Sequence, residues 1–124
     1  MAFTDPIAIS DDGVSRNLAR TGTTALESTY RLEDGSGNIH TLTLSHNFGG
    51  TKGGSSRRAL MRYSREYFVT DPLVTGQSQR IAVSATLTMS WPAIVTAADA
   101  AKRGVTIATL ASAANLLKVA GGET

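Results

Sequence analysis

The sequence contains no cysteine, which excludes a disulfide framework and any cysteine-ligated zinc or iron–sulfur site. Charged residues (18%) and aromatic residues (6%) are both sparse. No apolar run approaches the roughly 20 residues of a membrane-spanning helix, and the first six residues lack the basic and apolar segments of an export signal. We therefore expect a soluble protein that is not exported and has no membrane partner, with residues 1–124 forming a single domain.

Small polar residues fill the place of the missing charges and aromatics. Sixteen Thr, twelve Ser and twelve Gly make up 40 of the 124 positions, a composition that favours short strands and turns. The net charge of +2 is uneven, because the block from Lys52 to Arg80 holds six cations, five of them Arg. Since arginine binds phosphate with a planar fork of donors, this block indicates an anionic partner.

The hydrophobic pattern predicts an N-terminal β-hairpin in residues 1–20 and an antiparallel meander sheet in residues 25–91. The turn signal of the hairpin is Asp11-Asp12-Gly13. The long strands alternate between apolar and polar residues, so each has one face toward a core. Glycine-rich composition marks Gly49–Ser56 as a loop. The expected strands are Ala25–Leu32, Asn38–Phe48, Arg57–Phe68 and Gln79–Ser90.

Residues 96–119 are predicted to be helical, because ten of the seventeen Ala residues fall after Pro92. Thr96 with Asp99 forms an N-cap pattern. Gly104 is a candidate bend, which leaves open whether this region is one helix or a helix pair broken there. No charge occurs from Gly104 to Leu117, so this segment needs burial on more than one side. Its apolar stripe, the candidate dimer interface, is Ile107, Leu110, Ala114 and Leu117.

Catalytic and cofactor motifs are missing from the sequence. In the glycine-rich loop, Lys52 precedes the last glycine, so the order required of a phosphate-binding loop is not met. His40 and His46 share one strand face but lie roughly 20 Å apart at ~3.3 Å per residue, which excludes a shared metal and leaves two ordinary strand-end histidines. No nucleophile elbow or paired catalytic carboxylates are present. We expect no enzyme activity, cofactor, metal or small-molecule substrate.

The polar faces of the three long strands form a candidate nucleic-acid interface. If these strands pair in sequence, their hydroxyl and arginine side chains share one surface that suits a phosphate–sugar backbone. The alternative is an ordinary solvated face of an antiparallel sheet. The candidate residues are Thr41, Thr43, Ser45, Arg58, Arg62, Ser64, Ser84, Thr86 and Thr88.

The order of hairpin, three long strands, proline stop and C-terminal helix resembles the coat proteins of the single-stranded RNA bacteriophages of the levivirus type. The most family-like stretches are Arg57–Tyr67 and Arg80–Pro92, and the resemblance covers essentially the whole chain. It implies an α+β fold in which two subunits join their sheets edge to edge and interlock their C-terminal helices. It also implies an icosahedral shell in the virion, assembled in the bacterial cytoplasm.

The resemblance gives each predicted surface a role. The polar sheet face lines the shell and binds phage RNA, including a translational-operator hairpin, although no tyrosine stands on its last strand to stack a base as in the best-studied members. The loop of residues 69–78 contacts its copies around the symmetry axes through Asp71, Pro72, Leu73 and Gly76. Two alternatives remain: a dimeric β-sheet nucleic-acid-binding or regulatory module without a shell, and a small structural protein of unrelated fold.

Overall fold

The computed structural model describes residues 3–47, 50–51 and 54–123. The chain divides into two compact units. The first unit comprises Met1–Asn47 and Ala59–Thr88, and the second comprises Phe48–Arg58 and Met89–Thr124. The two longest strands contribute residues to both units, and the prediction of one domain stays a prediction.

An N-terminal hairpin opens the first unit. Strands β1 (Ile7–Asp11) and β2 (Val14–Thr23) pair with Asp11 opposite Val14, so the turn has two residues. Asp12 and Gly13 both have positive φ, 52° and 76°, as a type I′ turn requires. The hairpin predicted from this Asp-Gly signal is confirmed.

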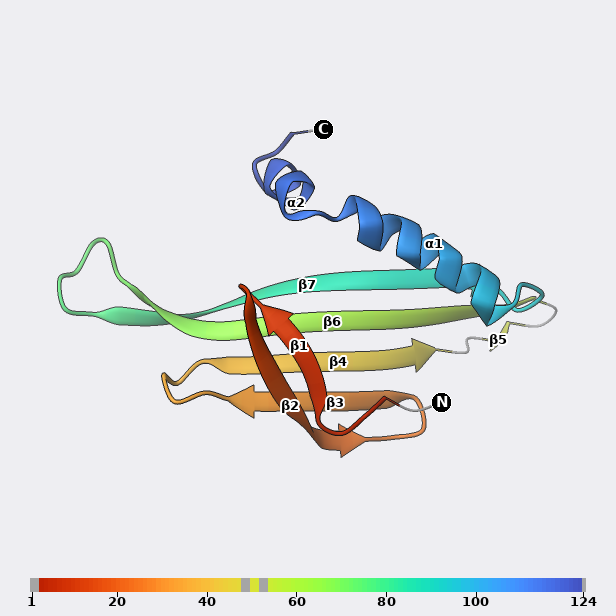
Figure 1. Cartoon of the computed structure of the whole chain (residues 1–124), viewed down its shortest axis with the longest axis horizontal. Coiled ribbons are helices and arrows are strands. Elements are labelled where there is room, and N and C mark those ends of the chain that lie inside the picture. Colours follow the sequence, from red (N-terminus) through yellow and green to blue (C-terminus); the bar gives the residue numbers. More distant parts are fainter. Residues whose placement is uncertain (1–2, 48–49, 52–53, 124) are drawn as a thin grey trace. The chain divides into compact units, whose positions relative to one another are not determined.

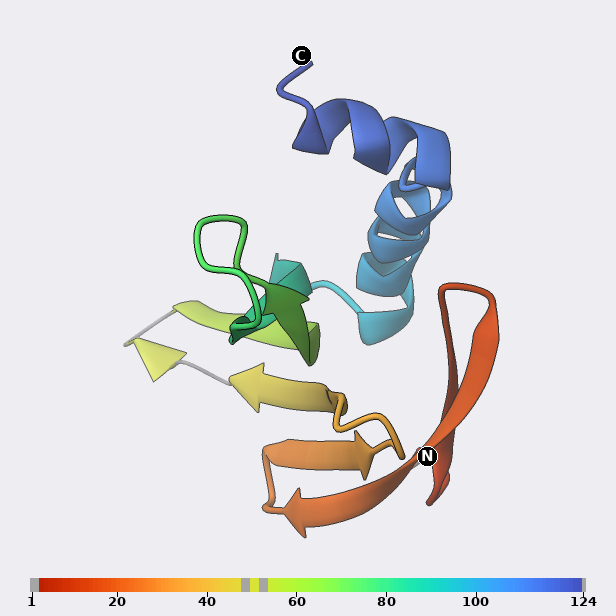
Figure 2. The ribbon, with the colours of Figure 1, turned by 90° about the vertical axis from the view of Figure 1, so that its left-hand side faces the viewer.

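Strand β2 changes partner halfway along its length. Its first half pairs with β1, whereas Ala19–Thr23 pairs with β3 (Glu27–Glu33), and the register shifts between Arg20 and Gly22. This irregularity bends the strand. The β1–β2 hairpin consequently runs across the neighbouring strands in Figure 1, while the end of β2 lies beside β3 in Figure 2.

The predicted meander is confirmed, with differences at its strand ends. Strand β3 pairs with β4 (Ile39–Asn47), β4 with β6 (Gly54–Thr70), and β6 with β7 (Ser78–Pro92). The prediction of a loop over residues 49–56 is wrong in part, because β5 (Gly50–Thr51) pairs with the start of β6. Phe48, Gly49, Lys52 and Gly53 lie outside the described residues.

The core of the first unit is formed by residues of the hairpin and the sheet. Its buried members are Leu18, Tyr30, Leu42 and Leu44, with Ile7, Ile9, Leu32 and Tyr63 packed against them. Leu42 and Leu44 are two residues apart, as the predicted alternation requires. Strand β7 follows its prediction less well, since Ile81 and Leu87 are half-buried whereas Val83 is 55% exposed.

The helical region forms two helices, α1 (Ala97–Leu110) and α2 (Ala113–Ala120). The Thr96 side chain accepts a hydrogen bond from the Asp99 backbone N–H, as the predicted N-cap requires. The chain breaks at Ala111–Ser112 and not at Gly104, because Ser112 caps a new helix by accepting from the Asn115 N–H. Neither helix is long and apolar enough to cross a membrane within the described part of the chain.

Gly104 is buried in α1, where it allows a close approach to β7. A Cβ atom on this residue would lie 2.5 Å from the sulfur of Met89. Both residues belong to the second unit. The glycine that the sequence marks as a bend is therefore a packing site between α1 and the end of β7.

Candidate nucleic-acid interface and subunit surfaces

Contacts between side chains show which residues of β4, β6 and β7 share a face. The Tyr63 hydroxyl of β6 lies 2.8 Å from Nδ1 of His40 on β4, so both residues lie on the core side. Arg80 of β7 donates to Glu66 of β6 at 2.9 Å, so these two share the opposite side. Because side chains alternate along a strand, the odd-numbered residues of β4 and the even-numbered residues of β6 and β7 lie opposite the core.

We call this surface the polar face; its residues come from β4, β6 and β7, which are neighbours in the sheet. It holds eight of the nine predicted RNA-binding residues within the first unit; Arg62, Ser84, Thr86 and Thr88 are exposed, and the other four are half-buried. The ninth, Arg58, is exposed on β6 but belongs to the second unit. The eight residues are Thr41, Thr43, Ser45, Arg62, Ser64, Ser84, Thr86 and Thr88.

Strand β3 adds residues to the polar face that the sequence analysis missed. Arg31 stands directly opposite Thr41 and is exposed, while Thr29 stands opposite Thr43. Directly paired residues project to the same side of an antiparallel sheet. The alternation of Tyr30 and Leu32 with polar neighbours was the signal that could have found Arg31.

Arg65 lies on the other side of the sheet, as its strand position predicts. Its guanidinium donates to the Asp11 carboxylate at 3.4 Å and lies over the Tyr67 ring, 5.5 Å from the centroid. Tyr63 and Tyr67 share this core side, so neither can stack a base on the polar face. Arg62 and Arg65 therefore form a matched pair of cations on opposite faces.

The predicted dimer-interface residues are largely uncovered in the single chain. Ile107, Leu110 and Leu117 are 53%, 64% and 75% exposed, and Ala114 is exposed as well. Ile107 and Leu110 also line an apolar groove between α1 and α2, with Leu116 and Val119. Two short helices thus present large apolar side chains without a covering layer.

The connection between β6 and β7 is an exposed loop closed at its base. The Asp71 backbone N–H donates to the Gln77 carbonyl at 2.9 Å, and the Asp71 side chain accepts from the Leu73 N–H at 2.8 Å. Pro72 is exposed, Leu73 is 90% exposed, and Gly76 has a φ of 86°. The loop therefore presents an apolar tip on a hydrogen-bonded base.

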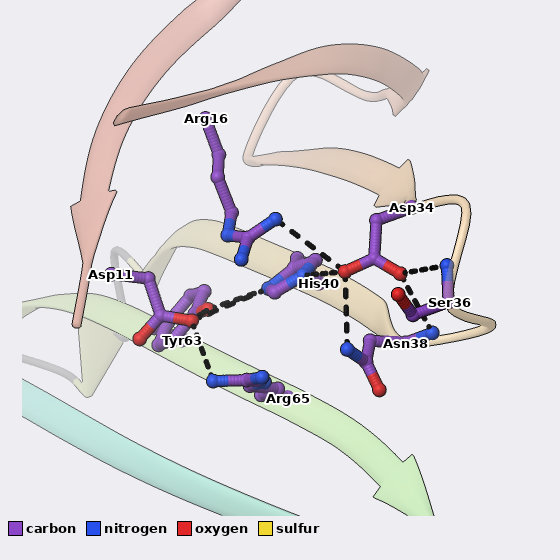
Figure 3. A network of polar contacts seen from close by, with 8 residues as sticks. All are labelled: Asp11, Arg16, Asp34, Ser36, Asn38, His40, Tyr63 and Arg65. Atoms are coloured by element: carbon purple, nitrogen blue, oxygen red, sulfur yellow. Dashed lines mark hydrogen bonds and ion pairs between the residues drawn. The ribbon is translucent and has the colours of Figure 1, made fainter. Parts of the chain in front are cut away.

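His40 differs from the strand-end histidine expected from the sequence, because it is fully buried. It lies at the centre of a polar network that connects the hairpin, the β3–β4 turn and β6 (Figure 3). Its Nε2 is 3.2 Å from an Asp34 carboxylate oxygen, and Arg16 donates to the same oxygen at 3.4 Å. Within residues 3–47, 50–51 and 54–123, no His, Asp or Glu cluster could hold a metal ion.

Two ionisable groups of this network have shifted pKa values. Burial would raise the pKa of Asp34, but hydrogen bonds from His40, from the Asn38 and Ser36 backbone and from the Asn38 side chain lower it from 3.8 to about 2. Burial, followed by the hydrogen bond to Asp11, raises the pKa of Tyr63 to about 12. Around neutral pH, Asp34 is therefore ionised and Tyr63 keeps its proton.

Comparisons with known proteins support the fold. No family model and no curated protein matches the sequence. The structure is similar to a subunit of the virus-like particle of Beihai levi-like virus 21, with a TM-score of 0.72 and 15% identity, covering 94% of this chain and 91% of that one. It is also similar to the virus-like particle of bacteriophage AVE019, with a TM-score of 0.74 and 19% identity, covering 96% and 95%. The chain therefore has the fold of a levivirus-type coat protein, as the sequence resemblance implies.

Proposed function

We propose that this protein is a capsid subunit that dimerises, assembles into an icosahedral shell and binds single-stranded phage RNA on its polar face. The observation that carries the proposal is the likeness to two chains from virus-like particles over at least 91% of each length. This role needs no catalytic activity. Its location is the virion, with assembly in the cytoplasm of the bacterial host.

The dimer step is supported by the apolar side chains that the single chain leaves exposed. Some of these side chains lie on α1 and α2, and another, Val83, lies on the core-side face of β7. Strand β7 also pairs only with β6 among the described residues, so its second edge is available to another copy. We propose that two subunits join their sheets at β7 and cover each other with their helices.

The RNA step is supported by the chemistry of the polar face. Arg31 and Arg62 provide guanidinium groups, and the surrounding Ser and Thr residues provide hydroxyls. Guanidiniums hold phosphates, and hydroxyls donate to or accept from sugars and base edges. At the polar-face positions of β6 and β7 the aromatic residue is Phe68, and the Arg80 guanidinium already lies over its ring, 5.4 Å from the centroid. We propose RNA contact governed mainly by charge. Translational repression would require an added preference for one hairpin.

Production of the full chain in bacteria tests the function directly. We expect particles that elute in the void volume of a sizing column, appear as closed shells by electron microscopy and contain RNA protected from nuclease. A dimer that binds RNA without forming particles would support the regulatory-module alternative. Shells that assemble without any nucleic acid would contradict the proposed RNA partner but leave the capsid role intact.

A further inference from the structure

The network around His40 connects parts of the chain that are far apart in sequence. The Nδ1 atom of His40 lies 2.8 Å from the Tyr63 hydroxyl oxygen, and this hydroxyl donates to an Asp11 carboxylate oxygen at 2.8 Å. On the other side of the ring, Nε2 lies 3.2 Å from Asp34. His40 thus stands between a carboxylate at the end of β1 and another in the β3–β4 turn (Figure 3).

Counting protons in this chain of hydrogen bonds fixes the state of the ring. An ionised carboxylate only accepts, so Nε2 must carry a proton to bond Asp34. The single Tyr63 proton is donated to Asp11, so the Tyr63 oxygen can only accept from Nδ1. Both ring nitrogens are therefore donors, and a histidine with two donors is a positively charged imidazolium.

We propose that His40 is a buried imidazolium that ties the N-terminal hairpin to the sheet, and that loss of its second proton as pH rises loosens the hairpin. A neutral ring has one donor only, so one of the two bonds must be lost. If Nδ1 loses its proton, the Tyr63 hydroxyl cannot donate to both His40 and Asp11.

The charged groups around the His40 ring act on its second proton in opposite directions. Asp11 on β1 and Asp34 in the turn favour the imidazolium, whereas Arg16 on β2 and Arg65 on β6 oppose it. Each arginine already pairs with one of the carboxylates at 3.4 Å. The charges of the two carboxylates and the two guanidiniums sum to zero. The positive charge of the ring is therefore not balanced by a further anion in this network, and the hydrogen bonds of the ring are what favour it.

The hydrogen bond from Tyr63 to Asp11 attaches the N-terminal hairpin to β6. Among the described residues strand β1 pairs only with β2, so its Asp11 end reaches β6 through side-chain contacts. Those contacts are the Tyr63 and Arg65 bonds to Asp11. Once the Tyr63 bond is lost, the longer Arg65 contact is what remains between Asp11 and the described part of β6.

Nitrogen NMR of the histidine rings tests the proton count in the full chain, with His46 as an internal reference on the same strand. Because both ring nitrogens must donate, we expect each His40 nitrogen to carry a proton in the folded chain at pH 6. Asp11→Asn should move the loss of the second proton to lower pH, and Asp12→Asn, which removes the same charge from the turn outside the network, should not. A folded protein with one bare His40 nitrogen at pH 6 would overturn the imidazolium.

Hydrogen exchange tests the consequence for the hairpin. Protection of the Ile9 and Arg16 amides, which belong to directly paired residues of β1 and β2, should fall about tenfold between pH 6 and pH 8 after correction for the intrinsic pH dependence of exchange, as expected for one charge-assisted hydrogen bond. In Tyr63→Phe, protection should be low at both pH values. Equal protection of the wild-type hairpin at pH 6 and pH 8 would overturn the switch, whether or not the protein forms shells.

Discussion

At the scale of single residues, Asp34 makes the stability of the fold sensitive to acid. Its pKa is about 2 in the folded chain and near 3.8 in the unfolded chain, so its stabilising effect is complete above about pH 4 and disappears as pH falls toward 2. Asp34→Asn should therefore lower the urea midpoint at pH 7, and the gap to wild type should shrink on acidification.

Urea unfolding at pH 7, 4 and 2 measures this dependence. Asp12→Asn is the matched control, because Asp12 stands in the β1–β2 turn, where asparagine accepts the positive φ of 52°. The control should leave the midpoint unchanged at all three values. A gap for Asp34→Asn that stays constant from pH 7 to pH 2 would contradict the role of its ionised form.

The network around Asp34 also marks the limit of prediction from sequence at this scale. Alternation placed His40 on the core side correctly, but nothing local indicated that its partners are Asp34 and Tyr63. The bond between Tyr63 and Asp11 joins residues 52 positions apart. Such contacts depend on how the hairpin crosses the sheet, which the pattern of one strand does not contain.

At the scale of secondary-structure elements, strand faces were predictable and helix ends were less so. Period-two patterns fixed the faces of β4, β6 and β7, because the side of each residue follows from its parity. Gly104 was the candidate for a break in the helical region, since glycine is unfavourable inside a helix, and a single unbroken helix was left open. The better signal was Ser112, whose side chain caps α2 three residues before Asn115.

Packing at Gly104 leads to a prediction about α1. Gly104→Leu should destabilise the protein by about 1–3 kcal/mol, although leucine favours helix, because the new side chain meets Met89. Urea unfolding of Gly104→Leu, Met89→Ala and the double variant measures the coupling. We expect the double variant to recover part of the loss, and strictly additive effects would show that Met89 is not the obstacle.

The β6–β7 loop should control assembly and not folding. Because its base is closed by the bond between Asp71 and Gln77, residues 72–76 can be replaced by Asn-Gly, which suits a tight hairpin turn. The shortened chain should keep its thermal midpoint and its dimer while particle formation is lost or changed. Sizing chromatography and electron microscopy check this, and unchanged particles would remove the proposed inter-dimer role.

At the scale of the whole molecule, the exposed helix stripe predicts an obligate dimer. Leu110→Asp should abolish the soluble dimer, since an unpaired charge buried in an interface costs about 3–5 kcal/mol. Lys102→Glu places a negative charge on an exposed residue of the same helix and should leave the dimer intact. Analytical ultracentrifugation separates the outcomes, and a well-folded dimeric Leu110→Asp protein would exclude this interface.

The polar face gives a prediction for RNA binding that depends on which side of the sheet an arginine occupies. Each phosphate contact to a single strand contributes about 0.7 to the slope of log affinity against log salt. Arg31→Ala and Arg62→Ala should each reduce that slope by about this amount, equally on a hairpin and on an unstructured RNA. Arg65→Ala removes the same charge from the core side and should leave the slope unchanged. Equal slopes for all three variants and the wild type would falsify the placement of RNA on the polar face.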